Sequence, residues 1–265
     1  MIDWGCAQVG SLLMNLSSPA VRDVVFDIDG TLCFNGATID DGIVDAIREL
    51  RNSHRVVFAS ARPIRDLLPV LPTDLHDAPL IGGNGAFVRD QAGSVVIGFD
   101  ADTRARLDAL ISEYSLTYLI DGDWDYSFTG DPSHRIFAQL DVGNLATNTA
   151  RDAIRTYSKA VLFTDDPYVI ARIKALTLSM NVHPDEKIID LAPDGVTKYH
   201  ALQRIGLRPG SYAAFGNDHN DVEMLRHAAW SVRVGRNDAL GFASFTARRE
   251  DVAEAIRSLG PTAFR

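Results

Sequence analysis

The chain contains little cysteine and no excess of positive charge. Its 265 residues include only two cysteines, Cys6 and Cys33. They are too few and too scattered for a disulfide framework or a zinc site, which favours a reducing, cytoplasmic setting. Lysine and arginine number 26 against 35 aspartates and glutamates, a net charge of -9, so nucleic acid is not expected as a partner. An anionic metabolite is not excluded, since a bound cation can reverse the local field.

Long hydrophobic runs are also absent from the sequence. No segment approaches the roughly 20 apolar residues that a membrane helix needs, so no membrane association is expected. The first part of the chain contains a short apolar patch, but no basic residue precedes Arg22, which argues against a secretory signal. We interpret residues 1–20 as a weakly docked N-terminal extension, although an overlong start assignment would look the same.

What the sequence does contain is short apolar runs separated by helical periodicity. Runs at 24–28 and 55–59 are followed by a shorter one at 80–81, and the pattern returns at 212–215 and 231–234. Short buried strands separated by helices are typical of a parallel sheet with crossover helices. The predicted fold class is therefore α/β, a doubly wound parallel sheet.

The middle third of the chain has a different pattern. Apolar pairs on either side of residues 91–93 predict a β-hairpin. Residues 135–140 alternate polar and apolar side chains, like a strand that is wet on one face. We interpret this part as an antiparallel α+β module inserted into the sheet domain. The expected domains are an N-terminal extension at 1–20, a catalytic core made of 21–85 and 187–265, and an inserted α+β cap at 86–186.

One predicted strand ends in two carboxylates. The apolar run Val24–Phe26 leads directly into Asp27-Ile28-Asp29-Gly30-Thr31, so Asp27 ends a strand and Gly30 lets the chain turn. Two carboxylates so close together repel each other unless a cation or a proton lies between them. A pair of aspartates alone is common in solvated turns. This placement, however, indicates a Mg²⁺ site with a carboxylate nucleophile and an acid/base partner.

Three further segments carry polar residues where the sheet pattern predicts strand ends. Ligand sites in open parallel sheets lie beyond the carboxyl ends of the strands, which makes these segments candidates. Taken singly, a serine there is more often a turn residue, and a lysine is more often solvated. The segments are Ser60-Ala61-Arg62-Pro63, Gly195-Val196-Thr197-Lys198 and Gly216-Asn217-Asp218-His219-Asn220-Asp221.

In this order, the four segments resemble the motifs of the haloacid dehalogenase superfamily, most closely those of its Cof-type sugar-phosphatase branch. The resemblance implies that Asp27 is the nucleophile and Asp29 the acid/base. It also implies that Ser60 supplies the phosphate-binding hydroxyl of the second motif, and that Arg62 is the arginine that follows it. Lys198 matches the lysine of the third motif. The resemblance covers nearly the whole chain after the N-terminal extension.

The fourth motif departs from the pattern of this branch, which usually reads Gly-Asp-x-x-Asn-Asp. The aspartate that commonly ligates Mg²⁺ is replaced by Asn217, whose amide oxygen can bind a cation but contributes no charge. Asp218 or Asp221 is left to take over as the charged ligand, and the sequence does not decide between them. The expected metal ligands are Asp27, Asp29, Asn217, Asp218 and Asp221.

The resemblance predicts an enzyme, a Mg²⁺-dependent phosphatase that hydrolyses a small phosphorylated metabolite through an aspartyl-phosphate. A sugar phosphate is the favoured substrate class. A phosphomutase and a catalytically weak ligand-binding or regulatory protein are the alternatives, and the sequence does not indicate the oligomeric state. The residues expected to bind the phosphate are Thr31, Ser60, Arg62, Lys198 and Asn220.

Overall fold

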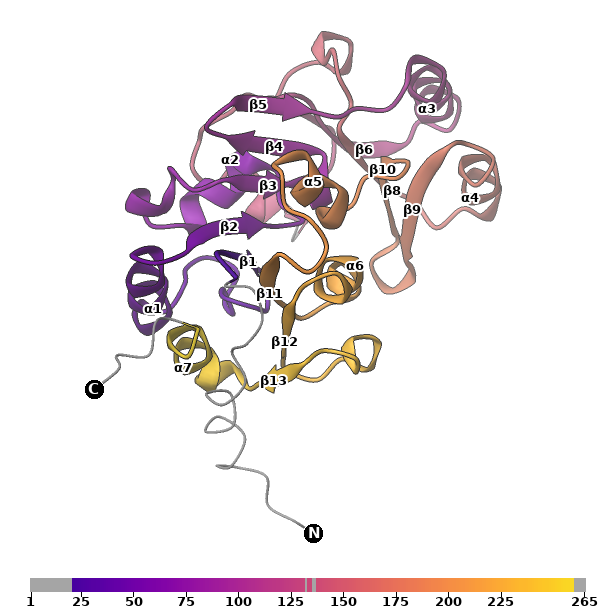
Figure 1. Cartoon of the computed structure of the whole chain (residues 1–265). Coiled ribbons are helices and arrows are strands. Elements are labelled where there is room, and N and C mark those ends of the chain that lie inside the picture. The colour runs from indigo at the N-terminus through magenta and orange to yellow at the C-terminus, as the bar shows by residue number, and fades with distance from the viewer. Residues whose placement is uncertain (1–20, 132, 135–136, 260–265) are drawn as a thin grey trace, which may run out of the picture. The chain divides into compact units, whose positions relative to one another are not determined.

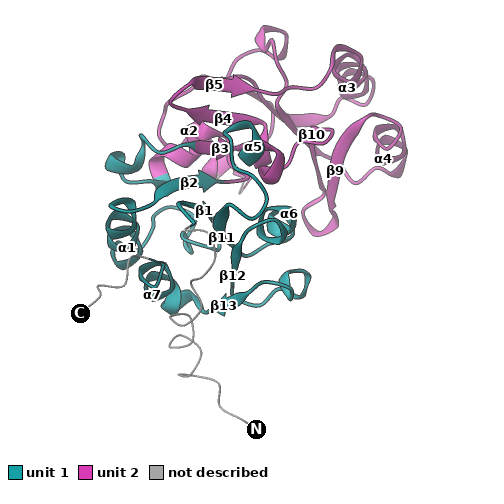
Figure 2. Cartoon of the chain, in the orientation of Figure 1, with its two compact units in different colours: residues 1–59, 70–79, 202–265 teal, residues 60–69, 80–201 magenta. Residues whose placement is uncertain are grey.

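The computed structural model describes residues 21–259 except 132, 135 and 136, so the expected N-terminal extension lies outside the described residues. The chain divides into two compact units (Figure 2). Unit 2 joins the expected cap with segments that precede and follow it in sequence, and the domain boundaries given above stay a prediction. Unit 1 comprises residues 1–59, 70–79 and 202–265, and unit 2 comprises residues 60–69 and 80–201.

Unit 1 is built on parallel strands, with β1 (Asp23–Asp27) between two neighbours. It pairs in parallel with β2 (Arg55–Ala59) on one side and with β11 (Tyr212–Gly216) on the other. Beyond β11 follow β12 (Trp230–Val234) and β13 (Phe245–Ala247), also parallel. The apolar residues of β1 are fully buried, as expected for a strand covered on both faces. The predicted α/β class with a parallel sheet is confirmed.

Helix α1 (Asp41–Arg51) follows the helical spacing predicted from the sequence. It buries Ile43, Ile47 and Leu50 on one face, because residues three and four apart lie on the same side of a helix. It packs against α7 (Val252–Arg257) (Figure 1). Three shorter helices are α2 (Ile64–Leu67), α5 (Lys198–Arg204) and α6 (Val222–Arg226).

Unit 2 contains two sets of antiparallel strands. In the first, β3 (Leu80–Gly82) pairs with β4 (Phe87–Asp90), and β4 pairs with β5 (Gly93–Val96). This pairing confirms the hairpin predicted around residues 91–93. The second set is a sheet with the order β7-β6-β8-β10-β9. Its strands are β6 (Thr117–Asp121), β7 (Tyr126–Phe128), β8 (Lys159–Phe163), β9 (Leu178–His183) and β10 (Ile188–Pro193).

Two helices pack on this sheet through a shared apolar cluster. Leu107 and Ile111 of α3 (Ala101–Glu113) and Val169 of α4 (Pro167–Ile173) belong to that cluster. Helix α4 begins with two features that favour a helix start, because the Asp166 carboxylate accepts a hydrogen bond from the N–H of Tyr168 and a proline occupies the first turn. The antiparallel α+β pattern predicted for the middle of the chain is therefore present in these elements.

The strand predicted at 135–140 is wrong for its described part. Phe137–Gln139 forms a single 3₁₀ turn. The Phe137 ring stacks on Phe128 of β7, with ring centroids 5.5 Å apart, and Leu140 is buried in an apolar cluster with Phe128. Phe137 and Leu140 thus lie near Phe128 of the sheet from positions three residues apart, a spacing that suits this turn and not a strand.

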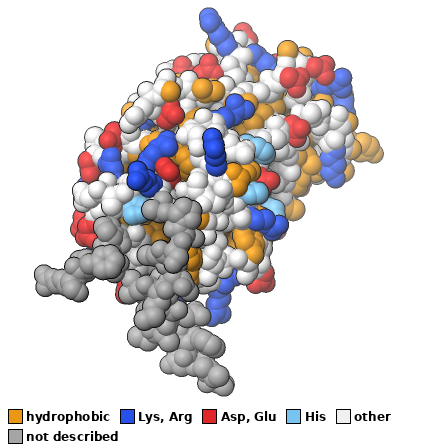
Figure 3. Space-filling view, viewed as in Figure 1, with side chains coloured by type: hydrophobic (Ala, Val, Ile, Leu, Met, Phe, Trp, Pro, Cys, Tyr) orange, Lys and Arg blue, Asp and Glu red, His pale blue; other side chains and the backbone are white. Residues whose placement is uncertain are grey.

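The described residues carry charges of both signs on the face shown in Figure 3. On this face, acidic and basic side chains are interspersed over the part of the chain that is described. Within the described residues, no helix is both long and apolar enough to cross a membrane.

Candidate functional site

Two loops of unit 1 leave the sheet at the same edge. Asp27 is the last residue of β1 and Gly216 the last of β11, and the two strands pair in parallel. The segments that follow, 28–33 and 217–221, therefore start beyond the carboxyl ends of neighbouring strands, where ligand sites of such sheets lie. The structure thereby brings the first and fourth predicted motifs together.

Thr31 joins these two motifs. Its hydroxyl lies 2.7 Å from Asp27 Oδ2, to which it donates, and 3.2 Å from Asn217 Oδ1. Asp27 is 4% exposed and Thr31 is fully buried. The hydroxyl therefore fixes the carboxylate beside the amide in a site that is largely closed to solvent.

The turn between Asp27 and Thr31 requires glycine. The carbonyl of Ile28 accepts hydrogen bonds from three N–H groups that follow, including that of Thr31 at 3.2 Å. Gly30 has a φ of +78°, and a Cβ there would lie 2.1 Å from Asn217 Nδ2. Both the backbone angle and the close approach exclude other residues without a shift. Asp29 is half-buried in this turn.

Asp221 holds the fourth-motif loop together. Its Oδ2 accepts hydrogen bonds from the N–H groups of Asn217 at 3.0 Å and of Asp218 at 3.1 Å, and the residue is fully buried. Asp218 in turn accepts from the N–H of His219 at 2.7 Å. One oxygen of Asp221 therefore fixes the backbone of the loop at 217–218. Asp218 and Asn220 are exposed.

Asn237 is a member of this group that the sequence did not reveal. Its side-chain amide donates to the carbonyl of Asn217 at 3.1 Å, so it helps to hold the backbone of the fourth motif. An asparagine in a loop gives no pattern that would have marked it.

The donor set in unit 1 is suited to a hard cation. The oxygens that Thr31 brings together are a carboxylate oxygen of Asp27 and the amide oxygen of Asn217, and Mg²⁺ prefers such oxygen ligands. Within the described residues, no group of three or more histidine, cysteine, aspartate and glutamate side chains is arranged to hold a metal. Asn217 is not one of these four residue types, although its amide oxygen can also bind a cation. The replacement at 217 therefore lowers the negative charge of the site without changing its oxygen chemistry.

The second and third predicted motifs lie in unit 2. Ser60 is fully buried, and its Oγ accepts a hydrogen bond from the N–H of Arg62 at 3.0 Å. The N–H groups of Gly83 and Asn84 donate to the carbonyls of Arg62 and Ser60 at 2.8 and 2.9 Å. Three backbone and side-chain contacts thus fix the conformation of the segment 60–62.

Lys198 is fully buried in the structure, unlike most lysines. The segment that carries it approaches Gly85 so closely that a Cβ on this glycine would lie 2.4 Å from the carbonyl oxygen of Thr197. Lys198 is therefore not one of the solvated lysines that such a position usually has, and its role in the site stays a prediction.

A cluster of buried charges in unit 2 was also missed from the sequence. Arg65 and Asp66 of α2 are 1% and 7% exposed, and Asp121 of β6 is 2% exposed. The only signal was an adjacent pair of opposite charges inside an otherwise apolar run. Such a pair is ordinarily assigned to a solvated helix face.

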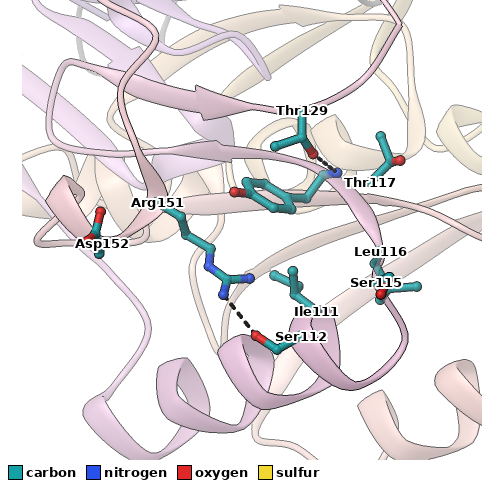
Figure 4. A pocket seen from close by; sticks show the side chains of 9 residues that line it. Ile111, Ser112, Ser115, Leu116, Thr117, Thr129, Arg151 and Asp152 are labelled. Carbon is teal, nitrogen blue, oxygen red and sulfur yellow. Dashed lines mark hydrogen bonds between the residues drawn. The ribbon is translucent and has the colours of Figure 1, made fainter.

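A hollow with a volume of several hundred cubic ångströms lies elsewhere in unit 2 (Figure 4). It measures about 650 Å³ and is lined mainly by α3, β6 and the segment at 151–152. The Arg151 guanidinium there donates to Ser112 at 3.0 Å and lies 3.3 Å from Asp108. Its lining residues include none of the site residues predicted from the sequence, so this hollow does not mark the same site.

The sequence profile of one family matches most of the chain. The profile of the haloacid dehalogenase-like hydrolases covers residues 24–240. The chain belongs to this family. The match includes all four motifs, so the resemblance inferred from them is confirmed.

Two curated relatives of this haloacid dehalogenase-like hydrolase are phosphatases. It is 26% identical over 235 residues to the 5-amino-6-(5-phospho-D-ribitylamino)uracil phosphatase YitU of Bacillus subtilis, covering 80% of this chain and 86% of the relative. It is 22% identical over 210 residues to the phosphoglycolate phosphatase of Methanospirillum hungatei, covering 78% and 81%. The prediction of a haloacid dehalogenase-type hydrolase, a phosphatase by its relatives, is confirmed.

Solved structures of low identity share the fold of the hydrolase. TM0651 from Thermotoga maritima matches with a TM-score of 0.74 at 19% identity, over 92% of this chain and 98% of that chain. The haloacid dehalogenase subclass IIB sugar phosphatase BT4131 matches with a TM-score of 0.70 at 18% identity, over 90% and 99%. These likenesses agree with the predicted fold.

Proposed function

We propose that this hydrolase is a Mg²⁺-dependent phosphomonoesterase that acts on a small phosphorylated metabolite. The observation that carries the proposal is the Asp27 carboxylate at the end of a parallel strand, held by Thr31 beside Asn217. A carboxylate fixed in one position is suited to nucleophilic attack. The family match and the phosphatase relatives support the same reaction class.

In the proposed reaction, an oxygen of Asp27 forms a bond to phosphorus while the bond to the leaving oxygen breaks. This step yields an aspartyl-phosphate and an alkoxide. Asp29 gives a proton to the alkoxide and then accepts one from the water that hydrolyses the aspartyl-phosphate. The hydrogen bond from Thr31 restricts rotation of the Asp27 carboxylate, which favours an in-line approach.

Asp27 and Asn217 are proposed to hold the magnesium ion, together with the backbone carbonyl of Asp29. Asp218 or Asp221 would supply a further carboxylate oxygen. When bound, Mg²⁺ neutralises charge on the carboxylate and on the phosphate. Because Asp221 Oδ2 accepts two backbone hydrogen bonds, any contact that Asp221 makes with the ion is expected through its other oxygen.

The hydroxyl and cationic groups of unit 2 are proposed to bind the phosphate. Ser60 offers a hydroxyl in a fixed backbone conformation, and Arg62 and Lys198 offer positive charge. Thr31 and Asn220 are the proposed contributions from unit 1. A dianion needs several such groups at once, since phosphoryl transfer depends mainly on positioning and charge stabilisation.

A sugar phosphate is the proposed substrate class. The structural likeness to a subclass IIB sugar phosphatase and the ribityl-phosphate substrate in the name of the Bacillus subtilis relative both favour a phosphorylated polyol or sugar. The relative from Methanospirillum hungatei makes phosphorylated hydroxy acids the next class to examine.

A phosphate-release screen on the full chain tests the proposal. Sugar phosphates, nucleotides and phosphoglycolate are incubated with the protein in the presence and absence of Mg²⁺. Release that requires Mg²⁺ is expected for at least one sugar phosphate. No release from any compound, while circular dichroism shows a folded protein, would overturn the proposal. Isomerised product in the same samples would favour the phosphomutase instead.

Asn217 favours one second candidate, a ligand-binding protein with weak turnover. The residue contributes no charge at a position where this branch usually has an aspartate, which would weaken cation binding. Binding of a sugar phosphate in calorimetry, without release of inorganic phosphate, would favour this candidate.

A further inference from the structure

Unit 2 contains a cluster of buried charges that the proposed reaction does not use. We name it the Arg65 cluster, and it consists of Arg65, Asp66, Asp121 and Asp141. The guanidinium of Arg65 donates to Asp121 Oδ1, and its Nη2 lies 3.3 Å from Asp66 Oδ2. Its Nη1 donates to the carbonyl of Trp124 at 3.0 Å. One side chain of α2 is therefore fixed to the end of β6 and to the turn that follows it.

The remaining members extend these contacts. Asp66 Oδ1 accepts a hydrogen bond from the N–H of Asp141 at 2.8 Å, and the Asp141 carboxylate accepts from the N–H of Leu145 at 2.7 Å. The Arg65 guanidinium also lies 4.9 Å from the centre of the Tyr126 ring of β7. The cluster thus ties the short helix α2 to β6, to β7 and to the loop at 141–146.

Stability alone does not account for burying these charges. Removing an arginine and its carboxylate partners from water costs several kcal/mol per ion, and apolar residues of similar volume often stabilise a fold equally well. Within the described residues, Arg65 Nε has no hydrogen-bond partner, and burial raises the pKa of Asp66 to about 6. What a guanidinium does supply is direction, because its donors point along fixed lines in one plane.

Arg65 lies on the helix that directly follows the segment 60–62, so its contacts restrict the position of that segment. Pro63 directly precedes α2, and Arg65 is only three residues beyond Arg62. The other side of this segment is fixed by β3 and the turn after it. Gly82 packs so closely that a Cβ there would lie 2.8 Å from the carbonyl oxygen of Arg62 and 2.9 Å from the N of Ile64. The segment is therefore held on both sides.

We propose that Arg65 is a positioning residue for phosphate binding, because its contacts with Asp121 and the Trp124 carbonyl fix the orientation of Ser60 and Arg62. Arg65 itself does not touch the phosphate. The inference rests on the proposed function, in which Ser60 and Arg62 bind the phosphate. It adds a link, within unit 2, between that binding and the sheet that carries β6 and β7.

Arg65→Lys tests this role, with Arg104→Lys as the matched control. Arg104 also belongs to unit 2, donates to the carbonyl of Ile154 at 2.7 Å and lies 4.4 Å from the centre of the Tyr157 ring. Both variants keep the charge and lose the planar fork. Affinity for inorganic phosphate is measured by calorimetry on the full chain with Mg²⁺, and kcat and KM are measured on the best substrate of the screen.

We expect Arg65→Lys to weaken phosphate binding and to raise KM about tenfold or more, because small misplacements of binding groups have effects of this size. kcat should change less, since binding lost equally from substrate and transition state appears in KM. Arg104→Lys should lower the melting temperature without changing phosphate affinity. Equal phosphate affinity in the two variants would overturn the positioning role.

Asp121→Asn provides a second variant in case Arg65→Lys does not fold. It keeps an oxygen that can accept from Arg65 and removes one charge, so a smaller loss of phosphate affinity is expected. Wild-type affinity in this folded variant would also count against the inference, while leaving the proposed function intact. A wild-type protein that neither binds inorganic phosphate nor releases it from any substrate would overturn both.

Discussion

The buried carboxylates of the two units have different kinds of partner. In unit 1, Asp27 accepts a hydrogen bond from a threonine hydroxyl, and Asp221 accepts two from backbone N–H groups. In unit 2, Asp66 and Asp121 lie against the guanidinium of Arg65. A neutral donor fixes the position of a carboxylate without cancelling its charge, whereas a guanidinium compensates that charge. Burial therefore does not by itself mark a reactive carboxylate, and the charge of the group that holds it is the more informative property.

Asp27→Asn is expected to have the largest effect and tests the first half of this comparison. The amide keeps the shape of the side chain but is not a nucleophile, so kcat should fall at least about 10³-fold. The melting temperature should change little. Asp23→Asn at the other end of β1, where Asp23 pairs with Arg55 at 3.4 Å, is the control and should keep its turnover. Activity near that of the wild type in Asp27→Asn would remove Asp27 from the chemistry.

Asp66→Asn tests the second half through the pH dependence of stability. Burial raises the pKa of Asp66 from 3.8 to about 6, so the folded protein holds this proton more tightly than the unfolded chain. Its contribution to the free energy of unfolding therefore falls as the pH rises from about 4 to about 6, by at most about 3 kcal/mol.

The asparagine variant lacks this titration, so its unfolding free energy should vary less across the same pH range. Denaturant unfolding at several pH values measures the difference. The control is Asp185→Asn, a substitution at an exposed position of the same unit, which should leave the wild-type profile unchanged. A profile for Asp66→Asn that parallels the wild type would show that Asp66 does not titrate in this range.

Asn217→Asp is expected to have the smallest effect. It sharpens the comparison because it adds a negative charge beside the Asp27 carboxylate of unit 1. If Asn217 ligates the cation, a carboxylate in its place should raise Mg²⁺ affinity about tenfold, because ligand charge sets the affinity of such sites. Calorimetric titration with Mg²⁺ measures this without turnover. Asn220→Asp adds the same charge at an exposed position of the same loop and should have a weaker effect. An unchanged affinity in Asn217→Asp would transfer the ligand role to Asp218 or Asp221.

The sequence was sufficient for features that local order determines. The apolar run before Asp27 predicted β1, and Gly30 after it predicted the turn that the structure shows. The motif order also gave the family, whose profile matches the chain. In these places the buried apolar residues and the polar residues that follow them are only a few positions apart in the sequence.

Features that depend on distant partners could not be predicted. Arg65 and Asp121 are 56 residues apart, and Asp66 and Asp141 are 75 apart, so no local pattern announces that these charges are buried together. The alternation at 135–140 was misleading because a 3₁₀ turn at Phe137–Gln139 also places apolar side chains, those of Phe137 and Leu140, near the sheet. The loop-shaping contacts of Asp221 Oδ2 also needed coordinates.

The tight contact at Gly30 makes one position intolerant of change. A methyl group there would collide with the side-chain amide of Asn217. A larger residue at position 30 would therefore displace the loop after β1, the loop after β11, or both. Gly42, in the first turn of α1, has open space around it, and alanine there would favour the helix by up to about 1 kcal/mol. In a library of random variants selected for function, codon 30 should stay invariant while codon 42 diversifies.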